Sequence, residues 1–348
     1  MIHQAPPAKT LADSLRRYRS PLMGIAIVLI LVCHNSLWFD RGILNELNRY
    51  ARSMAQVGVD LFLFCSGFGL YHAYRNATSL FGFYAKRLIR LLPAYFAAAL
   101  IWCLMQRHFG EPVRPFLQQY ALHAFFTRGE LIVWYIPGIL ALYLAYPLLN
   151  RVVLSRKRLI GFSACVIGLS FFIAAADSPC LSNQLKTVNE VLLVRIPIFA
   201  AGAYCAAAAI PSPGKKAVFG SLLLTPVLLV CLMLSMDHIT AISWWWVNRL
   251  LFAPLTVCLI ILALPCLEKW HTTGVVRVLD FLGGITLELY LMQERLLIYL
   301  QGYVFPFAKS PDAVMCLNLL SVFLALTLGY VLHILCGKIQ DILVKHFF

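Results

Sequence analysis

A histidine lies inside the first long apolar run of this chain, in the stretch ILVCHNSLWFD at residues 30 to 40. Ionisable side chains are costly at membrane depth and usually face a protein interior or a water-filled cavity. An imidazole has an unperturbed pKa of about 6.5, which suits proton transfer near neutral pH. His34 is therefore a candidate general base.

An acidic residue occupies the next apolar run, QVGVDLFLFCSGFGL. At about 1.5 Å per residue, His34 lies roughly 20 Å along a helix from Pro21, and Asp60 reaches a similar depth on the returning segment. A carboxylate at this depth would orient the imidazole and stabilise its protonated form. The pair could equally be an interhelical hydrogen bond that only stabilises the bundle. The sequence leaves both interpretations open.

Basic residues gather where the third apolar run begins, in YRNATSLFGFYAKRLIRLLPAYF. Arg87 and Arg90 are three residues apart and share a helix face, and Lys86 precedes Arg90 by four residues. Such a cluster is typical of the positive charge found on the cytoplasmic side of membrane helices. Arginine also binds phosphate with two parallel hydrogen bonds, so a phosphate-binding role is the alternative.

The stretch GGITLELYLMQERLLIYL places three charged groups in an apolar run. Glu288 and Arg295 are seven residues apart and share a helix face, while Tyr290 aligns with Gln293 and Glu294. Because charged groups are costly in a membrane, we expect this helix to face a cavity. Pairing of these charges with one another is the competing account.

The composition indicates an all-α, polytopic membrane helix bundle. Hydrophobic residues make up 61% of the chain and charged residues 13%, against roughly 25% in soluble domains. A spanning helix needs about 20 apolar residues, which predicts about ten transmembrane helices, at residues 20–39, 54–74, 88–106, 131–150, 159–176, 189–210, 217–236, 248–267, 279–300 and 313–335. A transmembrane domain at 20–340 is then flanked by cytoplasmic segments at 1–19 and 341–348.

Charge placement predicts the orientation of the bundle. With a cytoplasmic N-terminus, the inner segments hold 18 of the 29 Lys and Arg residues, so both termini are expected in the cytoplasm of a multi-pass cell (inner) membrane protein. The net charge of +14 is spread in short clusters between apolar runs, which argues against nucleic acid as a partner. Trp244, Trp245 and Trp246 are expected to anchor the outer membrane interface. The first apolar run is expected to be retained rather than cleaved as a signal peptide.

The remaining patterns bear on other kinds of site. The sequence has no CxxC pair and no Cys/His ligand spacing, so we expect neither a metal site nor a disulfide framework. The longest stretch between predicted spans, residues 107–130, is a candidate contact surface.

Taken together, several segments resemble acyltransferase family 3, a family of membrane proteins that transfer acyl groups, often acetyl, to sugars of surface polysaccharides. The resemblance extends over about residues 18–340 and rests on LMGIAIVLILVCHNSLWF, VDLFLFCSGFGL with the following FYAKRLIRLLPAYF, VWYIPGILALYLAYPLL, and GGITLELYLMQERLL. It implies a bundle of ten helices, a catalytic histidine at His34, and acyl-CoA handling by Arg87 and Arg90. Asp60, Ser66 and Gly67 match the VDxFxxxSGF segment of the family.

Two positions depart from the family pattern. Many members carry a basic residue where this chain has Met23, and Arg19, one turn earlier, is a possible substitute. Many also carry YLxH in the segment that corresponds to GGITLELYLMQERLL, and this chain has Gln293 in place of that histidine. These departures indicate either a rearranged donor site or a loss of activity.

The resemblance implies an O-acyltransferase, most simply an O-acetyltransferase, with His34 as general base and Asp60 beside it. Acyl-CoA would be the donor substrate, with no tightly bound cofactor, and the acceptor would be a hydroxyl of a cell-surface polysaccharide or of its lipid-linked precursor. Direct attack is favoured, although Ser66 or a cysteine could act as a nucleophile. The alternatives are a transporter or flippase of a saccharide or lipid-linked precursor, and an inactive relative that binds acyl-CoA.

Overall fold

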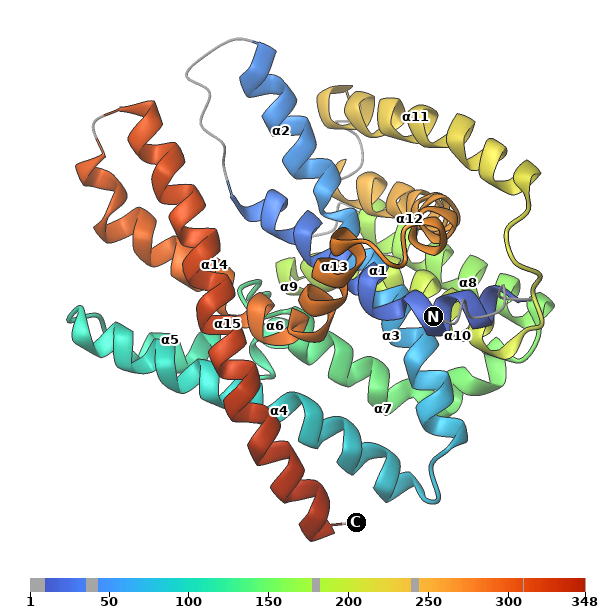
Figure 1. Cartoon of the computed structure of the whole chain (residues 1–348), viewed down its shortest axis with the longest axis horizontal. Coiled ribbons are helices and arrows are strands. Elements are labelled where there is room, and N and C mark those ends of the chain that lie inside the picture. The colour runs from blue at the N-terminus through green and yellow to red at the C-terminus, as the bar shows by residue number, and fades with distance from the viewer. Residues whose placement is uncertain (1–9, 36–42, 177–181, 239–243, 309, 348) are drawn as a thin grey trace.

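The computed structural model describes residues 10–35, 43–176, 182–238, 244–308 and 310–347 (Figure 1). Across these ranges the chain is predominantly helical and forms no strand, apart from one isolated antiparallel bridge between Thr10 and Pro211. Figure 1 shows the helices packed around one another at varied angles, with long helices on the periphery. The predicted all-α bundle is therefore confirmed.

The helices differ widely in length. The longer ones are α1 (Leu11–His34), α2 (Ile43–Ala55), α3 (Val57–Arg75), α4 (Leu80–His108), α7 (Tyr135–Val153), α8 (Arg156–Ala175), α10 (Ile196–Ala207), α11 (Lys215–His238), α12 (Trp244–Lys269), α14 (Thr286–Tyr303) and α15 (Pro311–Phe347). The shorter ones are α5 (Val113–Gln119), α6 (Ala124–Arg128), α9 (Asn183–Val191), α13 (Gly274–Gly284) and the 3₁₀ turns η1 (Leu193–Arg195) and η2 (Phe305–Phe307).

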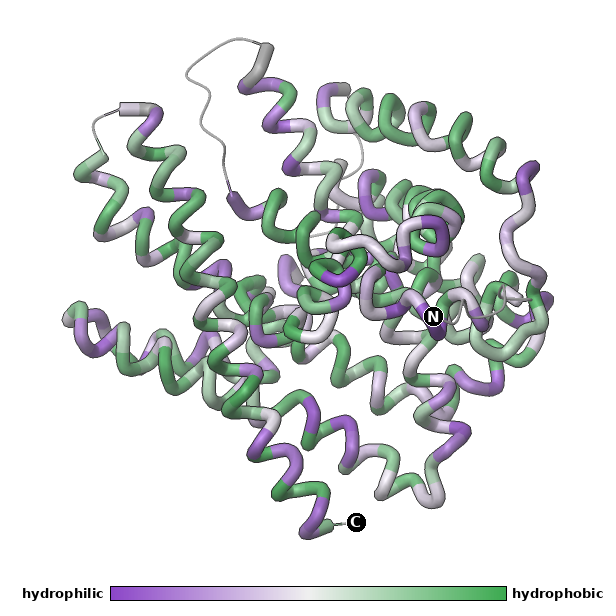
Figure 2. Tube along the Cα trace, viewed as in Figure 1, coloured by the Kyte–Doolittle hydropathy of each residue, from purple (hydrophilic) through white to green (hydrophobic). Residues whose placement is uncertain are grey.

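Within the described residues, eight helices are long and apolar enough to cross a membrane. They correspond to eight of the ten predicted spans, from residues 54–74 to 313–335. Helices α8 and α11 expose many large apolar side chains, such as Phe172 and Leu222, as expected of surfaces that face lipid. Figure 2 shows apolar residues along most of the helices, with hydrophilic residues gathered toward several of their ends. The chain is a multi-pass membrane protein.

The two other predicted spans take a different form. The span at 20–39 corresponds to α1, which ends at His34, and residues 36–39 lie outside the described part of the chain. The span at 279–300 was wrong as a continuous helix, because Ile285, with φ −103° and ψ 13°, separates α13 from α14. Gly283 and Gly284 precede this break, and glycine is a poor helix former. The polar residues of α14 thus belong to a separate helix.

Helices α3 and α10 approach unusually closely at two glycines. A Cβ atom added at Gly67 would lie 2.0 Å from the carbonyl oxygen of Phe199, and one added at Gly202 would lie 2.0 Å from that of Phe64. Small residues allow membrane helices to pack backbone against backbone in this way. This close packing positions the residues of α3 that face the cavity described below.

Candidate active site

A cavity of about 790 Å³ opens between α1, α2, α3, α4, α7, α12 and α14. Its described wall includes His34 of α1, Ser66 of α3, and the two arginines of the RxxR motif on α4. Residues that are distant in sequence therefore meet on one surface. The size of the cavity is in the range of small-molecule and cofactor sites.

One part of the cavity wall carries Arg19, Arg87 and Arg90. Electrostatic interactions link the three guanidinium groups, so they form one cluster, which we call the α1–α4 arginine cluster. Arg19 is fixed by a 3.0 Å hydrogen bond from its Nε to the carbonyl oxygen of Cys65. A Cβ atom at Gly69 would lie 2.7 Å from Cζ of Arg19, so the glycine makes room for this side chain.

The cluster bears on two positions that the sequence singled out, Met23 and Lys86. Arg19 shares the cavity wall with Met23, the position where many relatives are basic, so a guanidinium is available near that point. Lys86, by contrast, is exposed and is absent from the wall. Among the three basic residues predicted to bind acyl-CoA, the structure thus brings Arg87 and Arg90 together and leaves Lys86 outside.

His34 contacts Gln293 instead of Asp60. The distance from His34 Nδ1 to Gln293 Nε2 is 2.5 Å, and this contact joins the end of α1 to α14. The expected hydrogen bond between His34 and Asp60 was wrong, because Asp60 Oδ2 accepts from Arg195 Nε at 2.9 Å and Asp60 Oδ1 has no partner among the described residues. Gln293, at the position where the family pattern has a histidine, is therefore the residue that contacts the imidazole of His34.

The Asp60–Arg195 ion pair is deeply buried. The side chain of Asp60 is 0% exposed and that of Arg195 is 2% exposed, and Arg195 also donates from Nη1 to the carbonyl oxygen of Val191 at 3.1 Å. Removing one partner of such a pair leaves an uncompensated buried charge. The geometry gives Asp60 the role of neutralising Arg195, which lines the cavity.

The polar residues of α14 fall on different sides of the helix. Tyr290 and Glu294, one turn apart, line the cavity as expected. Glu288, Gln293 and Arg295 do not line it, so the expectation was wrong for these three, although Gln293 contacts His34.

The two charged residues off the wall have partners elsewhere. Glu288 lies 3.2 Å from His333 Nδ1 of α15. Arg295 donates to Gln119 of α5 at 2.7 Å and lies over the rings of Phe116 and Tyr120. Helix α5, within residues 107–130, thus contacts α14.

Ser66 lines the cavity beside an aromatic hydroxyl. Its Oγ lies 3.3 Å from the hydroxyl oxygen of Tyr135 on α7. Neither an imidazole nor a carboxylate of the described residues bonds to Ser66. Cys33, directly before His34, also lines the cavity.

Several wall residues were missed by the sequence analysis. Arg49, Arg52, Arg195 and Arg249 line the cavity, although the sequence patterns singled out none of them. Arg195 and Arg249 interrupt otherwise apolar runs, and that pattern alone indicates a functional position.

Two residues of the tryptophan run make contacts that the sequence did not predict. Trp246 is 5% exposed and donates to Ser170 Oγ at 2.7 Å, and Trp245 lies against Arg249 in the cavity wall. Trp246 therefore packs within the bundle, whereas Trp245 is 38% exposed and lines the cavity, and the membrane-interface role of the run stays a prediction.

Comparison with known families agrees with this arrangement. A family model described as an acyltransferase domain matches residues 22–336, nearly the whole chain. The corresponding searches among curated proteins and among solved structures found no match. The matched range includes His34 and both arginines of the RxxR motif, and it covers far more than half of the sequence. The chain therefore belongs to acyltransferase family 3 and is a membrane acyltransferase.

Proposed function

We propose that the protein is an O-acyltransferase of the cell (inner) membrane that transfers an acyl group, most simply acetyl, from acyl-CoA to a hydroxyl of a cell-surface polysaccharide or of its lipid-linked precursor. The observation that carries this proposal is that one cavity wall holds both the α1–α4 arginine cluster and His34. A donor with phosphates at one end and a thioester at the other matches those two features. The cavity thus suggests where each end of the donor would bind.

The donor would lie along α1. Three guanidinium groups suit the phosphates of CoA, because arginine forms charge-assisted hydrogen bonds to phosphate oxygens. Arg19 and His34 lie on the same helix, roughly 22 Å apart at about 1.5 Å per residue. The long, narrow arm of acyl-CoA would follow this path and bring the thioester carbonyl toward the imidazole.

The reaction needs a base for the acceptor hydroxyl. In the proposed step, His34 takes the proton of the hydroxyl as its oxygen forms a bond to the thioester carbonyl carbon. The resulting tetrahedral intermediate collapses, the carbon–sulfur bond breaks, and the CoA thiolate leaves and is protonated. The products are an ester on the acceptor and free CoA, and no oxidant, reductant or metal enters the balance.

The contact with Gln293 defines which imidazole nitrogen would act. An amide can present either its oxygen or its nitrogen, and the assignment follows from the hydrogen-bond network. If Gln293 accepts from Nδ1–H through Oε1, then Nε2 of His34 is unprotonated and available as the base. Gln293 Oε1 has no other partner among the described residues, which suits this orientation. Gln293 would then be a positioning residue for His34.

Direct attack fits the surroundings of Ser66 better than an acyl-enzyme does. A serine nucleophile needs an adjacent general base, and the bonded neighbour of Ser66 is the hydroxyl of Tyr135. A phenol is a poor base near neutral pH, because its unperturbed pKa is about 10. We therefore assign the base to His34 and leave Ser66 as a wall residue.

The test is transfer of radiolabel from acetyl-CoA to the surface polysaccharide fraction of membranes. Membranes would contain the intact protein, His34→Ala, His333→Ala or no protein, with the amounts of protein matched. His333 is the control because it lies on α15, away from the cavity wall. Label that needs the protein and His34 but not His333 supports the proposal. Label that survives His34→Ala would contradict the mechanism, and absence of label would contradict the activity and favour a transporter or an inactive relative.

A further inference from the structure

The wall of the cavity is strongly positive. Among the described residues that line it, seven are arginines and one, Glu294, is acidic; the arginines are Arg19, Arg49, Arg52, Arg87, Arg90, Arg195 and Arg249. Three of these form the α1–α4 arginine cluster assigned above to the donor. The four others lie elsewhere on the wall, and the next question is which negative charge neutralises each of them.

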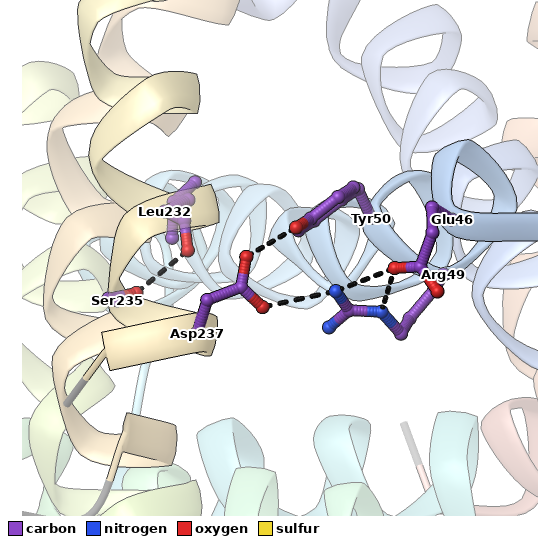
Figure 3. A network of polar contacts seen from close by, with 6 residues as sticks. All are labelled: Glu46, Arg49, Tyr50, Leu232, Ser235 and Asp237. Carbon is purple, nitrogen blue, oxygen red and sulfur yellow. Dashed lines mark hydrogen bonds and ion pairs between the residues drawn. The ribbon is translucent and has the colours of Figure 1, made fainter. Parts of the chain in front are cut away.

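Two of the four are neutralised by carboxylates. Arg195 pairs with Asp60. Arg49 lies between Glu46 at 2.8 Å and Asp237 at 3.0 Å, and Asp237 also accepts from Tyr50 (Figure 3). This network joins α2 to α11 and satisfies the Arg49 side chain. Neither arginine is left with excess charge.

Arg52 and Arg249 have no such partner. Neither lies within 4.0 Å of a carboxylate among the described residues. The Nε of Arg52 donates to the carbonyl oxygen of Cys33 at 3.0 Å, next to His34 in the chain. Cys33 also interacts electrostatically with Arg249, as it does with Arg195 and Glu294, and Cys33 and Arg249 both line the cavity. We call Arg52 and Arg249 the His34-side arginine pair.

Arg249 is held in place without being satisfied. The residue is 9% exposed, and its Nε has no hydrogen-bond partner among the described residues. Its guanidinium carbon lies 4.7 Å from the centroid of the Trp245 ring, a cation–π contact. A buried arginine with an unused donor is costly unless something supplies the missing negative charge. The cavity is the place from which that charge can come.

Nearby acidic residues do not remove the excess. Glu190 and Asp60 interact with Arg249 only at a distance, and Asp60 is already paired. Glu294 lies on the wall and makes no ion pair with a described residue. Even if Glu294 is fully ionised, it offsets one of the two positive charges. The region beside His34 keeps a net positive charge.

We propose that the acceptor is anionic, a saccharide unit whose carboxylate or phosphate binds to Arg52 and Arg249 while its hydroxyl faces His34. The inference rests on the proposed function, because it names the class of acceptor for the same site. A guanidinium binds a carboxylate or a phosphate with parallel hydrogen bonds. The acceptor must approach His34, and the His34-side arginine pair lies there, whereas the phosphates of CoA are assigned to the α1–α4 arginine cluster.

The charge of the labelled product tests this inference. Membranes containing the intact protein would be incubated with labelled acetyl-CoA, the polysaccharide and lipid fractions would be digested to single units, and the labelled unit would be separated by anion exchange at neutral pH. An anionic unit is expected, and a neutral labelled unit would overturn the inference. Loss of the charge with phosphatase identifies a phosphate, and loss after carbodiimide-coupled reduction identifies a carboxylate. Absence of any protein-dependent label would contradict the proposed function itself.

Variants of Arg249 provide the second arm. Arg249→Met removes the charge at similar length, and the initial rate of transfer to the membrane acceptor should fall about tenfold to a hundredfold, as expected for a lost hydrogen bond to a charged group. Arg249→Lys keeps the charge and should retain more of the rate. The KM for acetyl-CoA should be unchanged in both variants. A rate for Arg249→Met equal to that of the intact protein, at matched protein amounts, would overturn the inference.

Discussion

The two arginine groups of the cavity differ in exposure and in the way they are built. In the α1–α4 arginine cluster, Arg90 is exposed and Arg19 and Arg87 are partly buried. In the His34-side pair, Arg52 is partly buried, and Arg249 is buried and lies over the ring of Trp245. A group of three cations with one exposed member suits several phosphates that arrive from water, while a pair with one buried member suits a single anionic group. The comparison indicates two different ligands on one wall.

The buried Asp60–Arg195 pair should give the largest effect on the protein. Asp60→Ala leaves Arg195 buried without a counter-charge, at an expected cost of about 3–5 kcal/mol, so little folded protein should remain. Asp237→Ala removes a carboxylate from a more exposed network and should cost about 1 kcal/mol or less. Thermal unfolding of the detergent-solubilised proteins measures both.

The outcome for Asp60 bears on its role. If Asp60→Ala were as stable as the intact protein but lost activity, Asp60 would act in catalysis, as the sequence first indicated. The contrast between Arg195, which Asp60 neutralises, and Arg249, which has no carboxylate partner, would then need revision.

Loss of a guanidinium from the α1–α4 cluster should weaken donor binding. Arg87→Ala and Arg90→Ala should each raise the KM for acetyl-CoA about tenfold or more, since a hydrogen bond to a charged group contributes about 1.5–3 kcal/mol, with little change in kcat. Lys86→Ala, on the same helix but off the wall, is the matched control and should leave the KM within twofold. Initial rates over a range of acetyl-CoA concentrations measure these values. An equal rise in KM for Lys86→Ala would show a general effect of charge near the membrane.

A change at Gln293 should act on kcat rather than on KM. Gln293→Ala removes the group that orients His34 and should lower kcat about tenfold, which is less than the roughly hundredfold or more that positioned proton transfer as a whole contributes, while the KM for acetyl-CoA stays constant. Gln293→His, which supplies the residue found in many relatives, should recover part of the loss. A kcat unaffected by Gln293→Ala would mean that the contact with His34 has no part in turnover.

The smallest effect is expected at Glu288, which lies on the other side of α14. Glu288→Gln removes a buried charge but keeps a side-chain oxygen that can accept a hydrogen bond from His333, so stability should change by about 1 kcal/mol or less. The rate of transfer should stay within twofold, because neither residue lines the cavity. Parallel assays of unfolding and transfer measure both. A tenfold loss of activity would extend the site beyond the wall described above.

The sequence predicted the parts of the site that follow from local pattern. Apolar runs located the helices, and the depth of His34 and the three-residue spacing of Arg87 and Arg90 singled out those residues. The break at Ile285 was missed because the run remains apolar on both sides. The partner of Asp60 was missed because Arg195 is 135 residues away and lies in a 3₁₀ turn that no periodicity indicates. Arg52 and Arg249 carry no motif, and only folding brings them to the same cavity wall.

The most direct test of the two-ligand interpretation is an experimental structure of His34→Ala with intact acetyl-CoA bound. We expect phosphate density against Arg19, Arg87 and Arg90, with the acyl end of the donor directed toward position 34. Arg52 and Arg249 should remain free of CoA in that structure. Phosphates bound to Arg52 and Arg249 instead would contradict the assignment of both ends of the cavity.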